Sequence, residues 1–193
     1  MGKQKKLTRQ ENQEQTRQSL LDAAVTVFAK KGITGSSLAE IAQRAGYSKG
    51  AVYSNFTSKE DLALSVLERQ AESQLNELKQ LLPRMGGNPE FWMQQGQSGS
   101  QGPWELLLME LSVRAVRHSE IRERLTAYHQ HIIEEASQIL AGENQPTARQ
   151  RDAVLATTAL GSGMAMRYIA IPDKHLFEIW GKVVALLFDE MNK

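Results

Sequence analysis

The residues with the clearest chemical consequence in this chain of 193 residues stand at the expected starts of two helices. Ser36 and Ser37 precede one helix, and Lys59 begins another. Free backbone N–H groups and the positive end of the helix dipole make such starts suitable for a phosphate group. We therefore treat these residues as candidate phosphate contacts, with plain solvation of Lys59 as the alternative.

The elements that must position these groups are short helices whose starts are marked separately. Ser37, with Glu40 three residues later, has the spacing of a capping box. Ser48 can cap a second helix, and Ser58 with Asp61 repeats the capping pattern for a third. Residues 37–59 are therefore predicted to form two helices and the start of a third.

The sequence also indicates how the first two of these helices pack together. Ala42 is small enough to let a second helix cross closely, and Gly46 can take the left-handed conformation that ends the first helix. Val52 is spaced to fill the crossing. Together these features predict a helix-turn-helix.

Residues 46–56, followed by Ser58-Lys59-Glu60, resemble the recognition segment of the TetR family of transcriptional regulators. Upstream, an amphipathic helix ending at Gly32 and the run 33–41 match the family as well. The resemblance covers residues 16–67, and its Tyr-x-x-Phe-x-x-Lys-Glu continuation is absent from helix-turn-helix motifs of other families. Beyond Leu67 only the all-helical layout matches.

The resemblance implies contacts with double-stranded DNA. Lys49 and Gly50 fall in the first turn of the recognition helix, where a residue without a side chain lets the backbone approach DNA. Tyr53 matches a position that hydrogen-bonds phosphate, although it could instead be a core aromatic residue with its hydroxyl at the rim. Arg44 is an equal choice between DNA and solvent. The expected DNA contacts are Ser36, Ser37, Arg44, Lys49, Gly50, Ala51, Tyr53, Ser54, Asn55 and Lys59.

The net charge of +1 hides an uneven distribution. Residues 1–60 contain 10 Lys and Arg against 5 Asp and Glu, which gives +5, whereas residues 61–193 contain 13 against 17, which gives −4. A basic head on a mildly acidic body fits a protein whose head binds DNA.

The chain has no cysteine, residues 1–15 do not read as a signal peptide, and no apolar run approaches the ~20 residues that span a bilayer. We expect a cytoplasmic protein.

Helical periodicity recurs along the whole chain, which predicts an all-α fold. We expect a DNA-binding domain over 1–58, with a disordered basic arm over about 1–14 and the helix-turn-helix at 37–56. A ligand-binding and dimerisation domain is expected over 59–193. The expected helices are 16–31, 38–45, 49–55, 59–82, 103–117, 119–140, 147–170 and 173–191.

The body is expected to bind a small apolar or amphipathic effector. Residues 84–102 are rich in Gly, Gln, Ser and Asn and read as a flexible connection that could act as a gate. Aromatic and methionine side chains from the helices that follow could line an adaptable pocket, although each is also an ordinary core residue. The candidate ligand contacts are Trp92, Trp104, Met109, Tyr128, Met164 and Tyr168.

The last two helices carry more apolar surface than the edge of a monomer needs. The family resemblance implies that they pair with their symmetry mates as a four-helix interface, and Gly161 and Gly163 could allow a close approach. We expect a homodimer through residues 154–187 that binds a palindromic operator. The alternative is that these helices are the core of a single body domain.

Catalytic chemistry has little support in the sequence. Gly-x-Ser-x-Gly, a phosphate-cradling glycine loop and a cysteine nucleophile are absent, so we expect no catalytic residue and no cofactor. His129 and His131 are two apart and point to different sides of a helix, which argues against a metal site. The sequence therefore favours a repressor released from its operator by an effector, with an effector-independent regulator or an activator as the alternative and an enzyme as the contrasting class.

Overall fold

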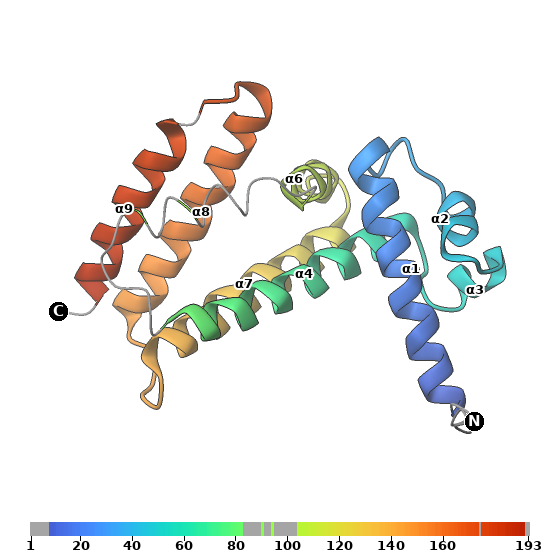
Figure 1. The fold of residues 1–193 in the computed structure, drawn as a ribbon, viewed down its shortest axis with the longest axis horizontal. Coiled ribbons are helices and arrows are strands. Elements are labelled where there is room, and N and C mark those ends of the chain that lie inside the picture. The colour runs from blue at the N-terminus through green and yellow to red at the C-terminus, as the bar shows by residue number, and fades with distance from the viewer. Residues whose placement is uncertain (1–7, 83–89, 91–93, 95–103, 174, 192–193) are drawn as a thin grey trace, which may run out of the picture. The chain divides into compact units, whose positions relative to one another are not determined.

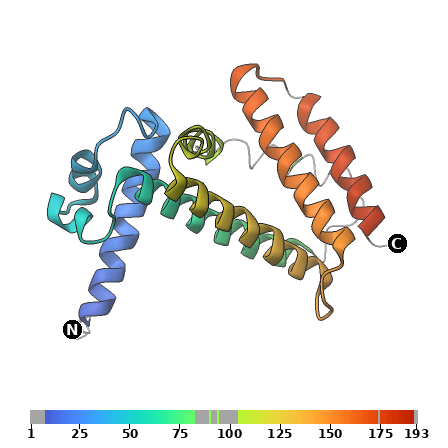
Figure 2. The ribbon, with the colours of Figure 1, turned by 180° about the vertical axis from the view of Figure 1, so that it is seen from behind.

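The computed structural model describes residues 8–82, 90, 94, 104–173 and 175–191 (Figures 1 and 2). Within those residues the chain is helical and has no β-strand, so the all-α expectation is confirmed. Trp92, the proposed gate at 84–102 and the first seven residues of the expected arm lie outside the described residues, apart from single positions 90 and 94. The helices are α1 (Arg9–Lys31), α2 (Leu38–Ala45), α3 (Lys49–Tyr53), α4 (Lys59–Leu81), α6 (Trp104–Ala115), α7 (Ser119–Ala141), α8 (Ala148–Ala170) and α9 (His175–Met191).

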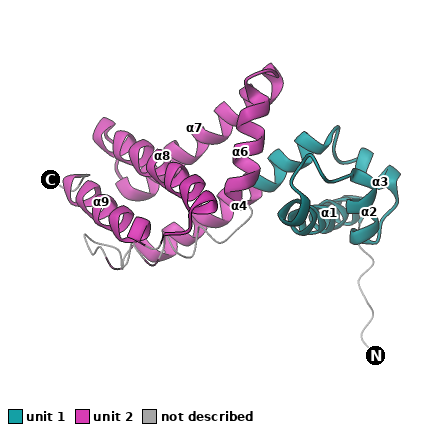
Figure 3. Ribbon diagram, turned by 90° about the horizontal axis from the view of Figure 1, so that it is seen from above, with its two compact units in different colours: residues 1–67 teal, residues 68–193 magenta. Residues whose placement is uncertain are grey.

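The chain divides into two compact units, residues 1–67 and 68–193 (Figure 3). The division falls inside α4, later than the 58/59 boundary that we expected. The reason is the burial of the first turns of α4: Leu62, Val66 and Leu67 are almost completely shielded from solvent. This part of α4 belongs to the first unit because its apolar face is needed there.

Helix α1 begins earlier than the sequence indicated. We expected a disordered arm to about residue 14, but α1 begins at Arg9. Thr8 and Glu11 form a complete capping box, in which Glu11 N donates to Thr8 Oγ1 at 3.2 Å and Thr8 N donates to Glu11 Oε2 at 2.6 Å. These bonds satisfy backbone donors that a helix start otherwise leaves free, so they stabilise the additional turns.

The first unit is a three-helix head completed by the start of α4. Its centre contains Phe28 of α1, Ile41 of α2, Val52 of α3 and Phe56, each no more than 1% exposed. The loop between α1 and α2 requires a residue without a side chain at Gly35, because a Cβ there would lie 2.5 Å from the carbonyl oxygen of Lys31. The backbone requirement at Gly35 and the shared apolar core thus stabilise the fold of the head.

The second unit is a helical body. The later part of α4 runs beside α7, as Figures 1 and 2 both show, and Arg124 and His131 of α7 contact Glu68 and Glu72 of α4 at 2.7 Å. Helices α8 and α9 form a hairpin, tied by the rings of Tyr168 and Phe177 with centroids 4.9 Å apart. The buried contacts of the body include one group formed by Leu75, Ala136, Ile139 and Val154 and another around Val184 and Ala185.

One polar group in the body core gives a direct stability prediction. Ser137 of α7 is fully buried, and its hydroxyl has no hydrogen-bond partner among the described residues. Ser137→Ala removes that unsatisfied hydroxyl, so we expect stability to rise by about 1 kcal/mol and the melting temperature by roughly 2–4 °C. Thermal unfolding followed by circular dichroism measures the change.

Ser112→Ala is the matched control for this substitution. Its hydroxyl is exposed and donates to the carbonyl of Leu108 at 2.7 Å, so the replacement gains only helix propensity. Equal stabilisation by both substitutions would show that the buried hydroxyl of Ser137 carries no penalty.

Candidate nucleic-acid interface

The helix-turn-helix is held by the capping bonds that the sequence predicted, with one difference. Ser37 Oγ accepts from Glu40 N at 3.1 Å, and Ser48 Oγ accepts from Ala51 N at 3.2 Å. The reciprocal half of the expected capping box at Ser37 is absent from the described contacts, because the Glu40 carboxylate instead pairs with Lys31 of α1 at 2.7 Å. The cap is therefore single, and the carboxylate links α2 to α1.

The turn between α2 and α3 follows from Gly46. Its φ of +77° lies in the left-handed region that favours glycine. Gly46 N donates to the carbonyl of Gln43 at 3.2 Å, and Tyr47 N donates to that of Ala42 at 2.9 Å. This pair of bonds is a Schellman motif, which ends α2 and sets the direction of α3.

Helix α3 presents an exposed surface with one basic and one phenolic side chain. Val52 is fully buried and anchors the helix, whereas Lys49, Gly50 and Tyr53 are exposed. Lys49 Nζ lies 5.9 Å from the centre of the Tyr53 ring, and Tyr53 is 54% exposed. The alternative of a core aromatic residue therefore does not fit Tyr53.

The remaining candidates on α3 are partly engaged within the helix. Ser54 Oγ donates to the carbonyl of Ala51 at 2.9 Å, and Asn55 Nδ2 donates to the same carbonyl at 2.8 Å. Ser54 is exposed, whereas Ala51 and Asn55 are half-buried. A contact from Ser54 or Asn55 to DNA would share or replace these bonds, so Lys49 and Tyr53 are the freer groups.

Ser36 and Lys59 have a different environment from the one we expected. Ser36 is buried, and its hydroxyl donates to the carbonyl of Ile33 at 2.8 Å. Lys59 Nζ donates to the carbonyls of Ile33 at 2.7 Å and Ser36 at 2.8 Å, with Thr34 at 3.4 Å. An ammonium group has three donors, and the loop between α1 and α2 takes them all. In this structure both side chains therefore stabilise that loop, which corrects the expectation that they point to phosphate.

Arg44 is exposed and lines an open groove between α1 and α2. The groove has a volume of about 440 Å³ and is lined by Thr26, Val27, Lys30, Lys31, Glu40, Gln43 and Arg44. Ser37 is also exposed, at the N-terminus of α2. Both residues remain accessible to a phosphate group.

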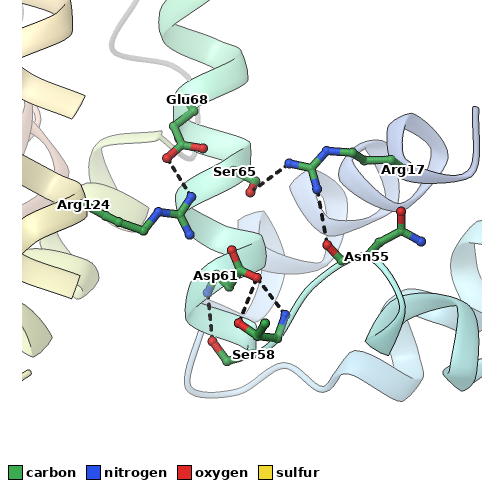
Figure 4. A network of polar contacts seen from close by, with 8 residues as sticks. Arg17, Asn55, Ser58, Asp61, Ser65, Glu68 and Arg124 are labelled. Atoms are coloured by element: carbon green, nitrogen blue, oxygen red, sulfur yellow. Dashed lines mark hydrogen bonds and ion pairs between the residues drawn. The ribbon is translucent and has the colours of Figure 1, made fainter. Parts of the chain in front are cut away.

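Sequence reasoning missed Arg17, which ties three parts of the head together (Figure 4). Its guanidinium donates to the Asn55 carbonyl at 3.4 Å and to Ser65 Oγ at 3.2 Å, and it lies 4.6 Å from the centre of the Phe56 ring. Asn55 follows α3 and Ser65 lies on α4, so Arg17 connects both to α1. These partners are 38 and 48 residues away, and no local pattern could have identified them.

The start of α4 carries its own cap, also visible in Figure 4. Asp61 N donates to Ser58 Oγ at 3.0 Å, as the sequence predicted, and Asp61 Oδ2 accepts from the backbone and hydroxyl of Thr57 at 2.7 and 3.0 Å. This cap and Lys59 together fix how the chain turns from α3 into α4.

The candidate ligand contacts of the body are spread over three helices. Trp104 and Met109 lie on α6, Tyr128 on α7 and Met164 on α8, and all four are half-buried. The ring of Tyr168 packs against that of Phe177 inside the α8–α9 hairpin, so this side chain helps to hold the two helices together. We found no group of three or more metal-ligating side chains within the described part of the chain.

Helix-turn-helix geometry in the first unit and a helical body in the second define the class: an all-α protein with a helix-turn-helix head. Residues 20–66 match the family model of bacterial regulatory proteins of the tetR family. The HTH-type transcriptional regulator AcrR of Shigella flexneri is 44% identical over 72 residues, which are 37% of this chain and 33% of that protein. The chain thus spans about a third of the length of this curated relative.

Solved structures show the same fold over nearly the whole chain. A TetR-family regulator from Mesorhizobium loti superposes with a TM-score of 0.66, covering 94% of this chain and 97% of its own at 21% identity. FadR from Bacillus subtilis in complex with stearoyl-CoA has a TM-score of 0.57, covering 89% and 97% at 20% identity. The family match over residues 20–66 confirms the resemblance seen in residues 16–67, and the solved structures show that the rest of the chain shares their fold.

Proposed function

We propose that this protein is a ligand-responsive transcriptional regulator of the cytoplasm, a homodimer that represses transcription until an effector releases it from its operator. The observation that carries the DNA-binding part is the surface of α3, where Lys49 and Tyr53 project from a helix anchored by buried Val52. Lysine and tyrosine are suited to phosphate and base edges, and the major groove is wide enough to admit an α-helix. An enzymatic role has no comparable support.

An exposed apolar face on α8 supports the dimer. Leu155, Ala159, Ser162, Met166 and Ile169 are all exposed and recur at alternating intervals of four and three residues. This is the spacing by which one helix packs along another, and the small residues in its middle permit a close approach. Ile179 and Leu186 on α9 are exposed as well, and they lie seven residues apart on one side of that helix.

The structure changes which residues this dimer would use. Val184, inside the expected range 154–187, is only 3% exposed and belongs to the intrachain core, as do Phe177 and Ala185. A Cβ on Gly161 would lie 3.5 Å from Trp180 Nε1, so Gly161 serves packing between α8 and α9 of one chain. Gly163 is exposed and unobstructed, and it remains a candidate for the interface.

A regulator needs a body that responds to a small molecule. The half-buried aromatic and methionine side chains of α6, α7 and α8 support this part of the proposal, and binding would act by favouring one arrangement of the two heads over another. The FadR neighbour, solved with stearoyl-CoA, is one example of this fold holding an amphipathic molecule.

Gel-shift titration tests the DNA-binding surface, with an operator obtained by selecting bound fragments from random DNA. Lys49→Ala is expected to weaken binding about tenfold and to alter sequence preference, since it removes a charge from the exposed side of α3. Tyr53→Phe is expected to weaken all sequences by a smaller and similar factor, with an unchanged salt slope, because it removes a hydroxyl group and no charge.

Lys79→Ala is the control for this experiment, because Lys79 is an exposed lysine of the last turn of α4 in the second unit. It should bind the operator like the wild type. Wild-type affinity and sequence preference in the Lys49→Ala protein would remove α3 from the interface.

A further inference from the structure

The body contains an acidic side chain that neither DNA binding nor dimerisation uses. Glu105 lies in the first turn of α6, and its Oε2 atom is shielded from solvent without a hydrogen-bond partner among the described residues. Burial raises the pKa of Glu105, and a hydrogen bond from its own backbone N–H offsets only part of that effect. A buried carboxylate is costly unless a positive charge or donors accompany it.

Tyr128 on α7 shares this environment. Helix α7 packs against α6, and the pKa of Tyr128 is raised to about 12, first by burial and second by the negative charge of Glu105. The phenol therefore stays neutral under ordinary conditions. Two oxygen-bearing groups whose anionic forms are both disfavoured make this a poor place for an anion.

The cation nearest along the Tyr128 side of α7 is already engaged. Arg124 lies four residues before Tyr128 and therefore on the same side of the helix, and its guanidinium pairs with Glu68 of α4 at 2.7 Å (Figure 4). The charge of Arg124 is thus held by another carboxylate. Glu105 is left as the acid for which the described part of the body provides no counter-ion.

Neighbouring positions of α6 carry side chains that suit the apolar part of a cation. Trp104 precedes Glu105, and Met109 lies one helical turn further along the same side of α6; both are half-buried, like Tyr128. Aromatic rings attract cations through their faces, and a methionine side chain adapts to an irregular apolar surface. The combination offers one negative charge within a mainly apolar surface.

We propose that the effector of this body is an organic cation with an apolar frame, whose positive charge lies beside Glu105 while its frame contacts Trp104, Met109 and Tyr128. The proposal rests on the regulatory function proposed above and adds the charge of the effector. It distinguishes this site from one built for a carboxylate or phosphate headgroup, which Glu105 would repel.

The test compares three probes with the full-length protein by isothermal titration calorimetry and by tryptophan fluorescence. Tetraphenylphosphonium is a permanent cation, triphenylphosphine oxide is a neutral molecule with three of the same rings, and laurate is an amphipathic anion. The wild type is expected to bind the cation at least tenfold more tightly than the other two. Glu105→Gln should reduce that preference at least tenfold while changing affinity for the neutral oxide less than twofold.

Thermal stability separates the proposed role of Glu105 from a structural one, because a carboxylate that stabilised the fold would make Glu105→Gln lower the melting temperature. Because burial raises the pKa of Glu105 above that of a carboxyl group in the unfolded chain, the folded state is penalised as the pH rises through the folded-state pKa. Glu105→Gln should therefore raise the melting temperature of the unliganded protein at pH 7.5, and the gain should shrink as the pH falls toward 4.5. Glu123→Gln, an exposed site on α7, is the control and should change neither binding nor stability.

Three outcomes would overturn the cation site: tighter binding of laurate or the oxide than of the cation, loss of all probe binding equally in Glu105→Gln, or no binding of the cation by the wild type. Operator binding, measured in the same preparation without a probe, reports on the regulator separately. A wild type that binds operator but prefers laurate would refute the charge assigned to the effector and leave the proposed regulatory function standing.

Discussion

Replacing Leu186 by glutamate is expected to convert the proposed dimer into folded monomers. Leu186 is 66% exposed on α9, so a carboxylate there is harmless in one chain but would be buried in the proposed interface. Burying an unpaired charge costs about 3 kcal/mol, and two-fold symmetry applies that cost twice, so the dimer constant should fall by roughly 10⁴. Met166→Glu on α8 should act in the same way.

Sedimentation measures the assembly state, and gel shifts should show operator affinity at least 100-fold lower, because a monomer engages a single half-site. Ala127→Glu, at an exposed position of α7, is the matched control and should remain a dimer. A dimer that persists in both the Leu186 and Met166 variants would mean that the exposed faces of α8 and α9 are not the interface, and the model of paired heads would then need another surface.

Replacing Lys59 by methionine is expected to destabilise the head. The substitution leaves the carbonyls of Ile33 and Ser36 without the donor that lies 2.7 and 2.8 Å from them. Hydrogen bonds from charged groups are worth about 1.5–3 kcal/mol each, less where water can take over, so we expect stability to fall by about 2–3 kcal/mol. Urea unfolding followed by circular dichroism measures the loss.

Lys59→Arg separates this role from phosphate binding. Arginine keeps the charge and binds phosphate well, but its planar guanidinium cannot replace a compact ammonium among three carbonyls. If Lys59 acts on the loop, the arginine variant should also lose stability, and neither variant should change the slope of log affinity against log salt. If Lys59 acts on phosphate, the methionine variant should keep wild-type stability and lose about one unit of slope, while the arginine variant should resemble the wild type.

The sequence by itself determined the helix starts and ends that depend on short-range bonds. Ser48, Ser58 and Thr147 cap helices at or next to the starts that we expected, since each cap needs only a side chain and a backbone N–H three residues away. Gly46 ends α2 because its left-handed φ is costly for any residue with a side chain. The helix-turn-helix was predictable because its information lies within 23 residues, from Ser37 to Lys59.

Only the tertiary structure decided which side chains are free to act. Lys59 was expected to contact phosphate, but its donors bind loop carbonyls 23 to 26 residues away. Val184 was expected to contact a second chain, but it is buried within the α8–α9 hairpin. Arg17 and Glu105 carried no local signal because their roles come from groups far along the chain or from burial itself. Capping bonds are short-range, whereas donor occupancy, shielding from water and charge compensation depend on what the whole fold brings together.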